Sequence, residues 1–328
     1  MYYYKNFNFS QYNDVIEHGG VGKRSHSVAE IIVTADTETS KEKPNEIVNG
    51  KYNTVINYVV AWTVTLLDPE TDRMNTVYGQ KPSELIECLD MIRRAIPGDE
   101  ILMYVHNLSY DWSFIRRWCL KRWGIPEMLN LRSHYPIRIK FPNGITLCDS
   151  AIVALRSLEK WAKDLGVKHQ KAVGDWDYEK IRHQNDIITD EEWHYVEYDT
   201  VALAECIRTL KDALQVPMCA FPYTATSIVR KDMYREGKKH QAHQAFLKLK
   251  PGYDLYRKLE KSFHGGYTHA NRFCLDETIS NVACYDFASS YPYCALAFAE
   301  FPVTAYQPVS GVKTVKDILD DKDHTYVF

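Results

Sequence analysis

Short hydrophobic segments separated by polar breaks dominate the first third of the chain. The apolar runs at residues 31–39, 58–67, 74–78 and 101–105 are short and contain many β-branched residues, which favours strands. Residues 82–92 instead place their apolar side chains at helical spacing, and a proline stands where that helix would begin. The pattern therefore predicts an α/β fold, with helices packed on a sheet.

Local signals predict further elements toward the middle of the chain. Pro142-Asn143-Gly144, flanked by apolar runs, is typical of a β-hairpin turn. Thr189 and Glu192 form a capping-box pattern at the start of a long helix that runs toward residue 214. Residues 223–262 are predicted to be helical and basic, and a new strand at residues 281–287 is expected to precede another helix.

These elements predict four consecutive parts. Residues 1–28 contain a flexible, basic glycine-rich stretch and are expected to form a partly ordered N-terminal arm. Residues 29–215 form the α/β domain, and the prolines that follow it mark its boundary. A connecting region over residues 216–270 and a final region over residues 271–328 complete the organisation.

The composition of the 328 residues limits the class of protein. With 45% hydrophobic and 25% charged residues, the chain resembles an ordinary globular protein. The formal net charge of −3 excludes a simple polycation that binds nucleic acid by bulk charge, but it permits a local basic groove. Eight cysteines without zinc-type spacing indicate reduced thiols. No apolar signal core or membrane-spanning segment is apparent, so we expect a cytoplasmic protein with no membrane partner.

The first candidate for chemistry is a pair of acids at the end of the first long strand. Asp36 and Glu38 are separated by one residue, so their side chains project from the same face of a strand. Like charges at this distance repel each other, and a divalent cation is the usual compensation. An isolated pair of this kind would more often be a solvated strand end.

Three residues elsewhere favour the metal-site interpretation. Asp111 follows a buried strand, at the edge where α/β sheets usually carry their functional groups. Tyr195 and Asp199 lie four residues apart, on one face of the long predicted helix. Taken singly, Asp111 fits an acid stabilised by the dipole at a helix N-terminus, and Tyr195 and Asp199 fit a solvated surface. Four acids together, however, provide the hard oxygen ligands that Mg²⁺ or Mn²⁺ prefers. Two such ions can hydrolyse a phosphodiester, with Tyr195 orienting the attacking water.

Five motifs in order resemble the family B DNA polymerases. Asp36-Thr37-Glu38, Asn107-Leu108-Ser109-Tyr110-Asp111 and the Tyr195–Asp199 pair resemble the three exonuclease motifs of that family. Phe263-His264-Gly265-Gly266-Tyr267 resembles the linker motif of the protein-primed branch found in bacteriophages, with phenylalanine in place of its tyrosine. Tyr285-Asp286-Phe287-Ala288-Ser289-Ser290-Tyr291-Pro292 resembles polymerase motif A.

The resemblance implies a fold and a set of site residues. It implies a ribonuclease-H-like exonuclease fold, with a mixed sheet flanked by helices, over residues 29–215 and the start of a polymerase palm over residues 271–328. The implied activity is 3′–5′ proofreading hydrolysis of single-stranded DNA ends with two Mg²⁺ or Mn²⁺ ions. The implied exonuclease residues are the metal ligands Asp36, Glu38, Asp111 and Asp199 and the catalytic Tyr195. The implied contacts with single-stranded DNA are Thr39, His106, Asn107, Tyr110 and Ser150. The implied template contacts are His264, Gly265 and Gly266, and the implied metal and nucleotide ligands are Asp286 and Tyr291.

Two departures from the family pattern bear on activity. The family carries a lysine directly before a Gly-Asp-x-Asp-Tyr segment, but here Lys171 lies two positions away from that place. The later polymerase motifs do not follow residue 292, so DNA synthesis is expected to need a further C-terminal part. The expected partners are a single-stranded DNA 3′ end, primer–template DNA, a terminal protein and the remaining polymerase half. The alternatives are a standalone nuclease and a single-strand or primer-end binding module with an inactive site.

Overall fold

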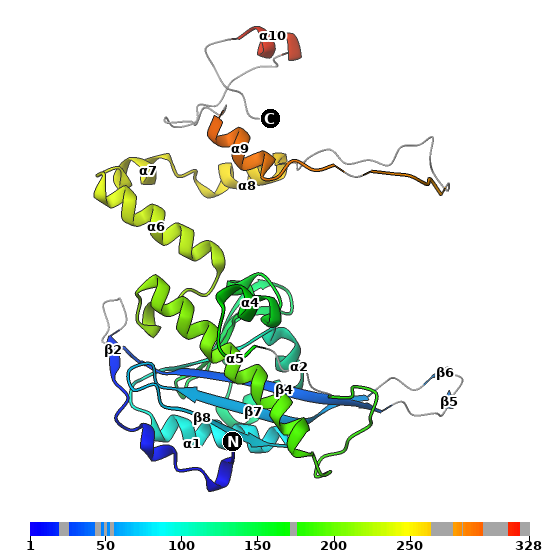
Figure 1. The fold of residues 1–328 in the computed structure, drawn as a ribbon. Coiled ribbons are helices and arrows are strands. Elements are labelled where there is room, and N and C mark those ends of the chain that lie inside the picture. Colours follow the sequence, from blue (N-terminus) through cyan, green and yellow to red (C-terminus); the bar gives the residue numbers. More distant parts are fainter. Residues whose placement is uncertain are drawn as a thin grey trace. The chain divides into compact units, whose positions relative to one another are not determined.

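A mixed sheet of eight strands is the framework of the first part of the chain (Figure 1). In spatial order its strands are β1 (Tyr2–Tyr3), β8 (Met74–Gly79), β7 (Ile56–Leu67), β4 (Ile32–Glu42), β9 (Ile101–Val105), β12 (Ile145–Asp149), β11 (Tyr135–Lys140) and β10 (Glu127–Arg132). The strand with Asp36 and Glu38, β4, pairs antiparallel with β7 and parallel with β9. This position places the predicted acidic pair in the middle of the sheet.

The chain divides into two units, Met1–Lys231 and Asp232–Phe328. Two small sheets accompany the large one: β2 (Glu17–Gly19) pairs with β3 (Ser27–Ala29), and β5 (Ile47–Val48) pairs with β6 (Lys51–Tyr52). The computed structural model describes residues 1–19, 26–42, 47–48, 51–52, 56–170, 176–263, 278–283, 285–297 and 314–321.

Helices cover both faces of the large sheet, which confirms the predicted α/β class. On one face lie α1 (Pro82–Ala95) and α2 (Leu108–Trp123), and on the other lie α4 (Leu158–Leu165) and α5 (Asp190–Leu214). Side chains alternate between the two faces along β4, so Val33 packs on the side of α1 and α2, whereas Ile32 packs on the side of α4 and α5. The remaining short helices of this unit are α3 (Ala151–Ala154), η1 (Tyr4–Asn6), η2 (Phe9–Tyr12) and η3 (Met218–Ala220).

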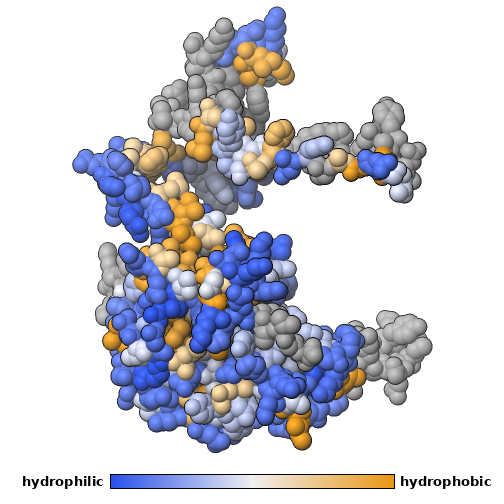
Figure 2. Space-filling model, viewed as in Figure 1, coloured by the Kyte–Doolittle hydropathy of each residue, from blue (hydrophilic) through white to orange (hydrophobic). Residues whose placement is uncertain are grey.

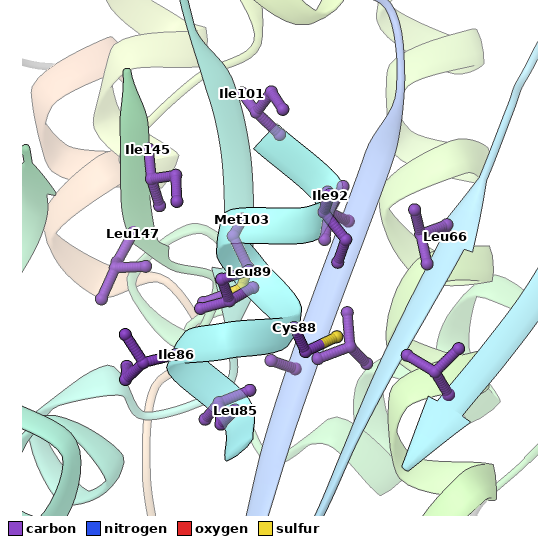
Figure 3. Close-up of a cluster of buried hydrophobic side chains, with 14 of the residues drawn as sticks. Leu66, Leu85, Ile86, Cys88, Leu89, Ile92, Ile101, Met103, Ile145 and Leu147 are labelled. Atoms are coloured by element: carbon purple, nitrogen blue, oxygen red, sulfur yellow. The ribbon is translucent and has the colours of Figure 1, made fainter. Parts of the chain in front are cut away.

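The hydrophobic core beneath α1 anchors the first face (Figure 3). Leu85, Leu89 and Ile92 recur at helical spacing and are all buried against strand residues such as Met103 and Leu66. Truncating a buried leucine to alanine typically costs about 2–5 kcal/mol, so this packing is a major contribution to stability. The helix predicted over residues 82–92 is thereby confirmed.

Buried hydroxyl groups fix α5 on the opposite face. The helix starts at the predicted capping box, where Thr189 Oγ1 accepts from the Glu192 N–H and Glu192 Oε2 accepts from the Thr189 N–H. Thr34 Oγ1 on β4 donates to the Thr200 carbonyl oxygen at 2.8 Å, and Thr65 Oγ1 on β7 donates to Thr200 Oγ1 at 2.9 Å. These directional bonds define where α5 sits along the sheet.

The N-terminal residues do not form the separate arm that the sequence predicts. Residues 1–19 pack on the first unit: β1 pairs parallel with β8, and Tyr4 and Tyr12 are fully buried in the core beside α1. The aromatic side chains explain the difference, because each buries a large apolar area while its hydroxyl finds a partner. Tyr4 donates to Glu87 at 2.7 Å. Residues 20–25 of the expected arm lie outside the described residues.

The second unit begins within a helix, and its described residues are mainly helical. The predicted helical region over residues 223–262 is confirmed as α6 (Ala225–Lys239), α7 (His243–Leu249) and α8 (Tyr253–Ser262). Two more helices follow, α9 (Ser290–Ala297) and α10 (Val315–Asp320). The strand predicted at residues 281–287 is wrong: residues 281–283 and 285–287 are exposed and are not in a strand. A strand is stable when neighbouring strands pair with it, and no described segment pairs with this one.

The face of the first unit that is visible in Figure 2 is mainly hydrophilic. Among the described helices, none combines the length and apolar character that crossing a bilayer requires.

The hydroxyl network leads to a first prediction. Thr200→Val should lower the free energy of unfolding by roughly 1–3 kcal/mol, because it removes the buried bonds that the Thr200 hydroxyl makes with Thr65 and with the Glu197 carbonyl oxygen. Urea unfolding measures the change. Thr226→Val on the exposed face of α6 is the matched control and should change it by less than about 0.5 kcal/mol. Equal effects of the two substitutions would show that the network does not hold α5.

Candidate functional site

Three of the predicted carboxylates converge between the sheet and α5. One oxygen from each of Asp36, Glu38 and Asp199 lies within 4.8 Å of the others. Asp36 and Glu38 project from β4 toward the face that α5 covers, and Asp199 directly precedes the Thr200 residue that is bonded to Thr34. Glu38 is buried, and the other two are half-buried. A cluster of carboxylate oxygens is the donor set that Mg²⁺ or Mn²⁺ accepts, so these residues fit such an ion.

Asp111 approaches β4 from the other face and is not part of this cluster. Its Oδ1 accepts from the Thr37 N–H at 3.2 Å and from Thr37 Oγ1 at 2.6 Å. Thr37 alternates with Asp36 and Glu38, so its side chain points toward α2 rather than α5. Burial raises the pKa of Asp111 to about 7, and the charge of Asp149 also raises it, although the bonds from Thr37 oppose the shift.

Two tyrosine hydroxyl groups meet beside the cluster. Tyr195 is one turn before Asp199 on α5 and is buried, and its hydroxyl lies 3.4 Å from that of Tyr178. Tyr178 is 55% exposed, but partial burial of its hydroxyl group, the charge of Glu38 and the bond to Tyr195 raise its pKa above the usual value, so it keeps its proton. Sequence reasoning did not select Tyr178 as a site residue. The sequence feature that could have identified it is its place at the end of the Gly-Asp-x-Asp-Tyr segment at residues 174–178.

Thr39 and Tyr110, both predicted DNA contacts, lie together at the edge of the site. Thr39 Oγ1 and the Tyr110 hydroxyl are 2.6 Å apart. A shift in the β4–β7 register between Glu38 and Thr39 locally changes the alternation of the strand. Tyr110 is 47% exposed at the start of α2, so its ring is available for stacking on a nucleic-acid base.

The remaining predicted DNA contacts of this unit form a second hydrogen-bonded group. The His106 Nε2 is 3.0 Å from the Arg156 carbonyl oxygen, which can only accept, so this nitrogen carries a proton. Burial lowers the pKa of His106, and its Nδ1 lies 3.1 Å from Ser150 Oγ, which donates to the Val105 carbonyl oxygen. Asn107 has a left-handed backbone (φ 73°) and donates its N–H to Asp149. Ser150 is buried, so its described contacts are with protein groups.

The other predicted site residues lie in the second unit or outside the described residues. Asp286 and Tyr291 belong to the second unit and are exposed. The residues that fall outside the described part of the chain are Lys171, His264, Gly265 and Gly266.

Part of the chain matches a known protein family. The family model for DNA polymerase type B, organellar and viral, matches residues 172–327. Residues 172–327 are thus similar to the type B DNA polymerases. This similarity agrees with the predicted resemblance to family B, whereas the protein-primed branch stays a prediction. No curated protein shows a significant sequence match to the chain.

Solved polymerase structures share the fold of this chain over about three quarters of its length. Phi29 DNA polymerase complexed with single-stranded DNA is similar with a TM-score of 0.57 at 20% identity, over 74% of this chain and 41% of that one. Phi29 DNA polymerase complexed with primer–template DNA and incoming nucleotide gives a TM-score of 0.55 at 18% identity, over 76% and 41%. The chain thus spans about two fifths of the length of these polymerases. The likeness and the mixed sheet flanked by helices agree with the predicted ribonuclease-H-like exonuclease fold.

The raised pKa of Asp111 generates a pH prediction. An ordinary aspartate ionises near pH 4, whereas Asp111 in the folded protein ionises at about 7. Between these values the folded state holds a proton that the unfolded state has released, so this group makes the folded protein less stable as pH rises. Asp111→Asn keeps the oxygen that accepts from Thr37 but removes this titration.

Urea unfolding with EDTA at pH 4 and pH 8 tests the pH prediction. The variant should match the unsubstituted protein near pH 4 and exceed its free energy of unfolding at pH 8. Glu70→Gln, in the exposed turn after β7, is the control and should give no such pH-dependent difference. An equal stability difference at both pH values for Asp111→Asn would contradict the assignment.

Proposed function

We propose that the first unit is the 3′–5′ exonuclease region of a family B DNA polymerase and hydrolyses single-stranded DNA ends. The observation that carries this proposal is the convergence of Asp36, Glu38 and Asp199 within 4.8 Å, with Tyr195 one turn away. Carboxylates from two separate elements, together with a buried tyrosine, suit phosphodiester hydrolysis better than a solvated strand end.

The carboxylates would hold Mg²⁺ or Mn²⁺, with two ions per site as the proposed number. When bound, such ions activate water and stabilise the leaving oxygen of a phosphodiester. The geometry supports three of the proposed ligands, Asp36, Glu38 and Asp199. Asp111 stays a predicted ligand, held by Thr37 on the other side of β4. Lys171 stays a candidate for a supporting charge.

Tyr195 would orient the attacking water. Its hydroxyl lies beside that of Tyr178, which keeps its proton and can therefore donate a hydrogen bond. The pair offers both a donor and an acceptor next to the carboxylates, which suits the positioning of a water molecule or a phosphate oxygen. We assign Tyr178 as a supporting residue of the proposed reaction.

The substrate would be the 3′ end of single-stranded DNA. Tyr110 exposes a ring for base stacking, and Thr39 beside it adds a hydroxyl. His106, Asn107 and Ser150 would order the adjoining strand-to-helix turn and line the path of the strand. Phi29 DNA polymerase, which has a similar fold, forms complexes with single-stranded and primer–template DNA, and this supports DNA as the partner.

The second unit would contribute to synthesis rather than to hydrolysis. Asp286 and Tyr291 would bind metal and nucleotide, and His264, Gly265 and Gly266 would contact the template. The remaining polymerase half and a terminal protein are the proposed partners for this step. Phosphoryl transfer needs more carboxylate ligands than Asp286 alone supplies.

Removal of the two strand carboxylates tests the proposed hydrolysis. Asp36→Ala/Glu38→Ala should reduce Mg²⁺-dependent degradation of an end-labelled DNA strand on the order of 10³-fold or more, because the cation loses two ligands. Circular dichroism should show an unchanged fold. Glu70→Ala/Glu191→Ala removes two exposed acids instead and should leave degradation unchanged. Retained degradation in the first variant, or binding of the strand without cleavage by the unsubstituted protein, would refute the proposal.

A further inference from the structure

A buried arginine connects the three elements that carry the proposed exonuclease site. Arg182 is 3% exposed and lies in the segment between Tyr178 and α5. Its backbone N–H donates to Ser40 Oγ on β4 at 2.9 Å, two residues beyond Glu38. Its Nη2 donates to Glu192 Oε1 in the first turn of α5 at 2.6 Å. One residue thus contacts the strand of Asp36 and Glu38 and the helix of Tyr195 and Asp199.

The same side chain also holds the segment that carries Tyr178. Arg182 Nη1 donates to the Asp177 carbonyl oxygen at 2.7 Å and to the Lys180 carbonyl oxygen at 3.2 Å. Its guanidinium lies 4.2 Å from the centroid of the buried Trp176 ring. These contacts fix the backbone on both sides of Tyr178, the residue whose hydroxyl reaches Tyr195.

The acceptor of Arg182 is itself firmly held. Glu192 forms the capping box with Thr189 and also pairs with Lys180 at 3.0 Å. Burial opposes its ionisation, but the bonds from Arg182, the Thr189 backbone and Lys180 lower the pKa of Glu192 to about 2. The carboxylate is therefore charged at every pH at which a nuclease would work.

We propose that Arg182 is a positioning residue that sets the Tyr178 hydroxyl against Tyr195 by joining the segment at residues 176–182 to Glu192 and Ser40. This inference rests on the proposed nuclease function, and it adds a residue that touches neither the substrate nor the cation. The planar guanidinium serves two carbonyl groups, a carboxylate and an aromatic face at once. A lysine ammonium carries the same charge but cannot reproduce this geometry.

Kinetics on matched arginine variants tests the positioning role. Arg182→Lys should lower kcat for hydrolysis of a DNA strand about 10- to 100-fold, since a small displacement of a positioning group has effects of this size. KM should change little, because the side-chain bonds that the substitution alters go to Asp177, Lys180 and Glu192 and not to Thr39 or Tyr110. Arg73 is the control: it also pairs with carboxylates, Asp14 and Asp68, and lies over the ring of Tyr12. Arg73→Lys should leave kcat unchanged.

A double-substitution cycle separates positioning from general destabilisation. If Arg182 acts through Tyr178, Arg182→Lys should cost less than about threefold in kcat when Tyr178→Phe is already present, since coupled residues are not additive. Glu192→Gln is a second variant: it preserves the capping box but weakens the bond to Arg182, so it should reproduce the loss of kcat. Additive effects in the cycle, or an equal loss from Arg73→Lys, would overturn the inference.

Amide hydrogen exchange gives a readout that does not need activity. Arg182→Lys should increase exchange in residues 176–182, whereas Arg73→Lys should not. If the unsubstituted protein fails to cleave DNA but this difference is present, the nuclease proposal fails and the structural part of the inference stands. Unchanged exchange in residues 176–182 would overturn the inference whatever the nuclease activity.

Discussion

The hydrogen bonds between Thr200 and the sheet are the constraint on which the proposed site depends. Hydrophobic packing brings α5 onto the sheet, but apolar contacts are non-directional and tolerate sliding. The bonds from Thr34 and Thr65 to Thr200 select one position along the helix axis. Asp199 precedes Thr200 in sequence, so the same bonds decide that its carboxylate meets the acids of β4.

That position has an electrostatic cost, which explains why the cluster points to a cation. Three carboxylates within 4.8 Å repel one another, and half-burial weakens the screening by water. A hard divalent ion would reduce this repulsion among Asp36, Glu38 and Asp199.

The sequence predicted those features that follow from local periodicity. Alternation placed Asp36 and Glu38 on one face, the capping box located the start of α5, and helical spacing put Tyr195 beside Asp199. These are properties of a few neighbouring residues. The fold class followed in the same way from the order of strand and helix patterns, and the comparison with solved polymerases agrees with it.

The features that depend on tertiary contacts could not be predicted in this way. The bond between Asp111 and Thr37 forms because α2 covers the opposite face of the sheet from α5, which only the path of the chain after β9 decides. Tyr178 lies in a segment without periodicity, so its location depends on Arg182. The aromatic residues near Tyr4 gave no periodic signal either, and they pack because α1 offers them a surface.

The most direct measurement is calorimetric titration of the protein with Mn²⁺, comparing it with the Asp199→Asn variant. This substitution keeps the size of the side chain but removes the only helix carboxylate of the described cluster. The account predicts that the substitution weakens Mn²⁺ binding by about tenfold or more. Equal affinity of the two proteins for Mn²⁺ would contradict a cation site built jointly by β4 and α5.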